Sequence, residues 1–169
     1  ALWHYARGLA FQHSGKAELA GRELAALRTI ALEPGLRDKY TAFAPTLKLI
    51  TIAEQVLAAE IAAGNRRYDE AIARLQRAVL LQDGLMYNEP PDWYFPVRHY
   101  LGAVLLEAGL PQEAEAVYWQ DLALYRENGY SLLGLQQALE AQGRTGEAAS
   151  FAERQRQAFW KLRDSVPEA

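Results

Sequence analysis

The chain has 169 residues, half of them hydrophobic, with a net charge of -3 and no cysteine. This length and composition are sufficient to bury a substantial core and exclude a disordered chain, while the mixed charges offer no basic field for nucleic acid. The absence of cysteine excludes disulfides and thiolate chemistry, and the longest apolar stretch, 47–63, is interrupted by Lys48, Glu54 and Glu60, so it does not read as a membrane span.

Apolar residues at helical spacing predict eight helices along the chain. In the second helix, for example, Ala20, Leu24 and Leu27 are four and three residues apart and form one stripe. Glycine suits the left-handed residue that closes a helix, as Gly15 does after the first one. In chain order, the predicted helices span residues 2–14, 17–32, 45–63, 68–82, 96–108, 111–125, 130–142 and 145–163.

Two segments between these helices lack a regular helical pattern. Residues 36–44 are expected to form a loop with a short helical turn. The segment from Tyr87 to Pro96 contains three prolines, which forbid a regular helix interior, and the aromatic residues Trp93, Tyr94 and Phe95. This aromatic cluster either fills a gap between helix pairs or forms an exposed hot spot for a partner, and we favour the structural interpretation.

The second half of the chain repeats itself at a spacing of 34 residues. The recurring residues are a glycine, Gly109 and Gly143, and an alanine, Ala114 and Ala148. A Leu-Gly step also occurs twice, at 101–102 and at 133–134, and an aromatic residue, Tyr118, follows Ala114 by four positions. Looser versions of the alanine position are Ala20 and Ala71, where inserted loop residues stretch the spacing.

These residues resemble the tetratricopeptide repeat, of the bacterial type, a helix–turn–helix unit of about 34 residues. The resemblance implies an all-α solenoid of about four antiparallel helix pairs. It also implies a single domain over residues 1–169, which we expect to be a fragment of a longer chain with a flexible tail at 164–169.

Candidate catalytic residues are few. His4 and His13 are nine residues apart, which is not the spacing that places two metal ligands on one helix face. Paired carboxylates fall in the first turns of predicted helices, where they complement the helix dipole. We therefore expect no enzyme, no metal and no cofactor. Asp121 is expected to be partly buried and paired with Arg98, because it occupies a packing position of the repeat.

The resemblance implies a protein or peptide partner, because in this family the first helix of each pair lines the concave surface. The residues that we place in this groove are Tyr5, Gln12, Glu54, His99, Leu106, Asn128, Ser131 and Leu135. We expect no nucleic-acid or membrane partner, and both the cytoplasm and the periplasm remain open. The alternatives are a structural segment that self-associates through its terminal helices, a solvated face without a ligand, or an accessory domain that binds a small ligand near Trp93.

Overall fold

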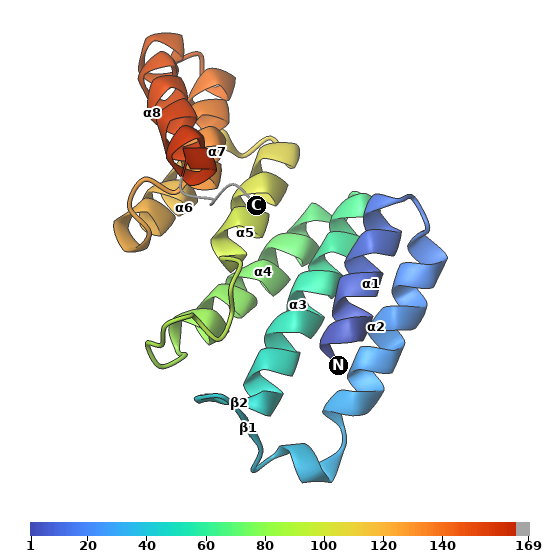
Figure 1. Cartoon of the computed structure of the whole chain (residues 1–169). Coiled ribbons are helices and arrows are strands. Elements are labelled where there is room, and N and C mark those ends of the chain that lie inside the picture. Colours follow the sequence, from blue (N-terminus) through green and yellow to red (C-terminus); the bar gives the residue numbers. More distant parts are fainter. Residues whose placement is uncertain (165–169) are drawn as a thin grey trace. The chain divides into compact units, whose positions relative to one another are not determined.

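The computed structural model describes residues 1–164, and the fold of this part is all-α (Figure 1). Every predicted helix is present, and each end lies within one residue of its predicted position. The helices are α1 Leu2–His13, α2 Ala17–Ala31, α3 Thr46–Gly64, α4 Tyr68–Asp83, α5 Val97–Glu107, α6 Pro111–Leu124, α7 Gly129–Ala141 and α8 Thr145–Asp164. Of the tail predicted at 164–169, Asp164 ends α8 and the remainder lies outside the described residues.

The segment between α2 and α3 differs from the prediction. Its helical turn comes earlier, as the 3₁₀ turn η1 at Pro34–Leu36, and a small hairpin follows it. Strands β1 (Tyr40–Thr41) and β2 (Ala44–Pro45) pair antiparallel. Strands of two residues are too short to produce an alternating apolar pattern, so the sequence carried no signal for them.

The chain divides into two compact units, unit 1 over residues 1–97 and unit 2 from Arg98 onward, and each is described by itself. The single domain predicted over 1–169 stays a prediction. In unit 1, α3 is the central helix and packs against α1, α2 and α4. This central position explains why the sequence of α3 is apolar over most of its length. Within residues 1–164, no helix is long and apolar enough to cross a membrane.

In unit 2, α7 packs against both α6 and α8, and Tyr118 of α6 brings the neighbouring helices together. Its ring lies between Gly102 of α5 and Gly134 of α7. A Cβ atom would lie 2.3 Å from the Tyr118 ring at Gly102 and 2.1 Å from it at Gly134, so only glycine fits at either position. The two Leu-Gly steps of the sequence are therefore the two contact points of one aromatic ring.

The same corner joins the two helices of every pair within the described residues. Its central residue has a positive φ: Gly15 (72°), Arg66 (58°), Gly109 (76°) and Gly143 (77°). At Gly109, the amide of Gly109 donates to the carbonyl of Leu106 at 3.0 Å and that of Leu110 to Leu105 at 2.9 Å, a pair of bonds that closes a helix with a left-handed residue. The prediction that Gly109 and Gly143 lie at corners is confirmed.

A buried alanine follows each of these corners by five residues. Its amide donates to the carbonyl four residues earlier, so it lies in the first turn of the second helix. The four alanines are Ala20, Ala71, Ala114 and Ala148, each at most 1% exposed. The repeat read in the second half of the sequence thus has a structural counterpart in all four helix pairs of the described chain.

Candidate interaction surface

A buried polar cluster, which we call the polar triangle, connects three helices of unit 2. It consists of His99 on α5, Asp121 on α6 and Ser131 on α7. The Ser131 Oγ lies 2.5 Å from Asp121 Oδ2 and 2.9 Å from His99 Nε2, and the latter lies 3.0 Å from Asp121 Oδ2. Buried polar groups are usually hydrogen-bonded, and these three bond to one another through Ser131 Oγ, His99 Nε2 and Asp121 Oδ2. The other carboxylate oxygen, Asp121 Oδ1, is buried without a hydrogen-bond partner among the described residues.

The donor and acceptor roles in these bonds are those of a structural link between α5, α6 and α7. The Ser131 hydroxyl donates to Asp121, so its oxygen is left to accept from His99 Nε2. A serine nucleophile needs the opposite arrangement, in which the hydroxyl donates to a histidine that a carboxylate orients from the other ring nitrogen. Asp121 is 0% exposed, as the sequence suggested in part, but its partners are His99 and Ser131 rather than Arg98.

Tyr118 lies near the polar triangle and is buried itself. Burial raises the pKa of the Tyr118 hydroxyl to about 12, and the negative charge of Asp121 contributes to the same shift. The neutral phenol is therefore strongly preferred between the two glycines.

The groove residues predicted in unit 2 lie mostly within the helix packing. His99, Ser131 and Leu135 are buried, so their side chains do not line an open surface. Leu106 is half-buried. Asn128 precedes α7 and caps it, because its side-chain oxygen accepts from the amides of Tyr130 at 3.0 Å and Ser131 at 3.3 Å.

Of the three groove residues predicted in unit 1, Tyr5 and Glu54 contact other side chains, whereas the buried Gln12 Oε1 has no hydrogen-bond partner among the described residues. Tyr5 is buried, and its ring centroid lies 5.5 Å from that of Trp93. Gln12 and Glu54 are half-buried, and Glu54 accepts a hydrogen bond at 2.9 Å from Arg28 of α2. The structure thus brings His99 and Ser131 together in one buried cluster, whereas Glu54 takes part in a separate ion pair.

The aromatic residues before α5 divide into two environments. Trp93 is 6% exposed and packs on Tyr5, which supports the structural interpretation of this residue. Tyr94 is 80% exposed and meets half-buried Phe95 edge-on, with 6.5 Å between their ring centroids. Only Tyr94 of the three offers most of its side chain to a partner.

One solvent-accessible position of the first helices has the same place relative to every corner. Six positions before the corner residue, the side chains reach solvent in every pair of the described chain. In α5 and α7 these are Ala103 and Gln137, both exposed. In α1 and α3 they are Leu9 and Glu60, both half-buried. The sequence analysis missed Gln137, although its spacing from Gly143 equals that of Ala103 from Gly109 and would have identified it.

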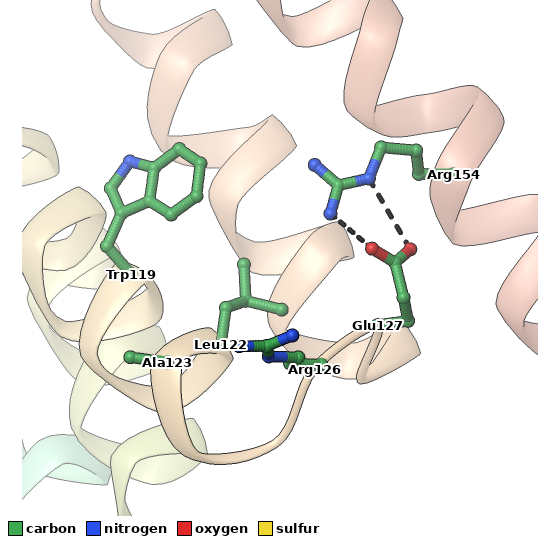
Figure 2. A pocket seen from close by; sticks show the side chains of 6 residues that line it. All are labelled: Trp119, Leu122, Ala123, Arg126, Glu127 and Arg154. Atoms are coloured by element: carbon green, nitrogen blue, oxygen red, sulfur yellow. Dashed lines mark hydrogen bonds and ion pairs between the residues drawn. The ribbon is translucent and has the colours of Figure 1, made fainter.

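A second accessible feature of unit 2 is a pocket between α6, the loop that follows it, and α8 (Figure 2). Its volume is about 320 Å³, and it is lined by Trp119, Leu122, Ala123, Arg126, Glu127 and Arg154. Trp119 is 45% exposed because it follows the core residue Tyr118 and therefore points away from the α6 packing face. The sequence analysis did not predict this pocket.

Comparisons with known proteins do not extend this description. No family model matches the chain, and searches of curated proteins and of solved structures find no match either. In the described residues, no three His, Asp or Glu side chains gather in a way that would hold a metal ion. The functional argument therefore depends on the geometry of the chain itself.

Proposed function

We propose that this chain is a tetratricopeptide-like scaffold that binds a protein partner through a peptide segment on the accessible face of its first helices. The observation that supports this proposal is the corner with its buried alanine, which occurs in all four helix pairs of the described residues. Repeated units place equivalent side chains on successive helices, and such arrays are used as extended binding surfaces.

The accessible residues of unit 2 suit a peptide backbone. Ala103 is small and lets a chain approach α5 closely, while the amide of Gln137 on α7 can both donate and accept hydrogen bonds. An extended segment that lies across α5 and α7 would meet these two positions in turn. The peptide contacts are therefore expected at Ala103 and Gln137 rather than at the buried residues His99, Ser131 and Leu135.

Two other functions have less support. Catalysis by the polar triangle is disfavoured because its side chains are buried and its hydroxyl donates to the carboxylate. A small-ligand site at Trp93 is disfavoured because the indole is buried against Tyr5. Both observations favour a role in packing for these groups.

A displayed library of random peptides, selected against the purified chain, tests the proposal. The selected peptides are then titrated by fluorescence anisotropy against the double variant Ala103→Arg, Gln137→Arg, whose substituted positions are exposed and tolerate charge. We expect about tenfold or greater loss of affinity, because two long cations occupy the binding face. Gln112→Arg, at an exposed position of α6, is the matched control and should bind like the original chain. Equal binding to the double variant would contradict the proposal.

A further inference from the structure

The pocket of Figure 2 has the size and lining of a site for one large apolar side chain. Trp119, Leu122 and Ala123 form its apolar part, and all three come from α6. Its volume of about 320 Å³ lies at the lower end of the range seen for ligand sites. A large aromatic or branched aliphatic side chain therefore fits, with room for a neighbouring group beside it.

Side chains on two sides hold the pocket in shape. The Trp119 ring meets Phe151 of α8 edge-on, with 5.5 Å between centroids and 82° between planes. Arg154 lies 5.3 Å above the Phe151 ring and forms an ion pair with Glu127 at 2.5 Å. A lining that is already ordered loses little conformational entropy when a ligand binds.

The polar edge of the pocket carries one unbalanced positive charge. Glu127 neutralises Arg154, as the dashed lines of Figure 2 show. Arg126, by contrast, forms no hydrogen bond or ion pair with any residue in the described part of the chain. A guanidinium presents a planar fork of donors that matches a carboxylate, so an acidic group beside the apolar one would complete the site.

From this lining we infer that the pocket binds a peptide segment in which a large apolar side chain stands next to an acidic one. The apolar side chain lies against Trp119 and Leu122, and the carboxylate pairs with Arg126. We commit to a peptide rather than a free acid because the pocket is open and two exposed apolar residues follow it, Leu124 at the end of α6 and Tyr125 just after it. The site lies on second helices, so it is distinct from the first-helix face of the proposed function.

The probe is a short peptide, capped at both ends and labelled with fluorescein, with a central phenylalanine between two glutamates. Anisotropy gives its affinity, and the indole N–H signals in a ¹⁵N-resolved NMR spectrum give its location. We expect weak but saturable binding that shifts the signal of Trp119 and leaves those of Trp3 and Trp93 in place. Replacement of both glutamates by glutamine, or of phenylalanine by alanine, should each weaken binding about tenfold.

Two protein variants test the two halves of the site. Arg126→Gln should lower the affinity about tenfold and reduce the preference for glutamate over glutamine, and Ala123→Glu, at an exposed position, should abolish binding by charge and bulk. Arg77→Gln removes an exposed arginine of α4 and is the matched control for net charge.

Several results would overturn the inference. These are an unchanged affinity for Arg126→Gln, a shift confined to another indole, or binding of phenylacetate without binding of the peptide. Binding of the glutamine peptide as tightly as the glutamate peptide would also contradict it. None of these outcomes depends on the first-helix face, so failure here leaves the proposed function to its own test.

Discussion

At the scale of single residues, Tyr118 sets the distance between neighbouring helices of unit 2. Its ring occupies the space that side chains would fill at Gly102 and Gly134, and its hydroxyl is neutral beside the polar triangle. The glycines are thus required for close approach, and their φ values play no part. Substitution of either glycine by alanine would therefore force the Tyr118 ring or the neighbouring helix to shift.

We predict that Gly134→Ala destabilises the chain by about 1–3 kcal/mol, because overpacking outweighs the better helix propensity of alanine. Gly21→Ala is the control, since Gly21 lies within α2 and a Cβ there meets nothing within 4 Å. That variant should gain about 0.5–1 kcal/mol. Urea unfolding followed by circular dichroism measures both, and a stabilising Gly134→Ala would show that the Tyr118 contact is not tight.

The raised pKa of Tyr118 predicts a loss of stability at alkaline pH. The folded chain holds the proton to about pH 12, whereas an ordinary tyrosine releases it near 10.0. A group with a raised folded pKa stabilises fully below its unfolded pKa and loses this contribution as the pH rises through its folded pKa. The free energy of unfolding should therefore fall by about 2–3 kcal/mol between these two pH values.

Tyr118→Phe isolates this contribution, because it keeps the ring and removes the ionisable hydroxyl. Urea unfolding at successive alkaline pH values gives the free energy of unfolding at each pH. This free energy should decrease less with rising pH for the variant than for the original chain. Parallel pH dependences would contradict the assignment of the alkaline loss to Tyr118.

At the scale of elements, the corner determines where each helix pair turns. Three of the four corners in the described chain use glycine, and the α3–α4 corner uses Arg66 at a φ of 58°. A non-glycine residue in this left-handed conformation is strained by about 1–2 kcal/mol. Glycine would remove this strain, but it would also raise the conformational entropy of the unfolded chain, which offsets part of the gain in stability.

We therefore predict opposite effects at two equivalent corners. Arg66→Gly should stabilise the chain by about 0.5–1 kcal/mol, and Gly143→Ala should destabilise it by about 1 kcal/mol. Both positions are exposed, so side-chain packing contributes little to either change. Differential scanning calorimetry gives the shift of each transition, and shifts of the same sign would refute the equivalence of the corners.

The elements were largely predictable from the sequence, and the site was not. Glycine and proline positions locate helix ends directly, which is why each end agrees to within one residue. The groove residues were chosen by assuming that each first helix buries a single face. In the structure, α7 packs against helices on both sides, so Ser131 and Leu135 are buried. The pocket at Trp119 combines α6, a loop and α8, which no local pattern connects.

At the scale of the whole molecule, four helix pairs with one kind of corner occur within residues 1–164, distributed over two compact units. Each unit contains first helices with a solvent-accessible position six residues before the corner. The proposed function uses this accessible face in unit 2, and the proposed peptide pocket uses α6 and α8 of the same unit. A partner that engages both would contact the chain on first and second helices.

The central claim is that a partner peptide contacts the first helices, and cross-saturation NMR with a library-selected peptide tests it directly. Saturation of the peptide should reduce the signals of the Ala103 methyl group and the Gln137 side-chain amide, and leave that of the Gln112 amide on α6 unchanged. Losses at Gln112 or at the Trp119 indole, with Ala103 and Gln137 unaffected, would contradict the claim.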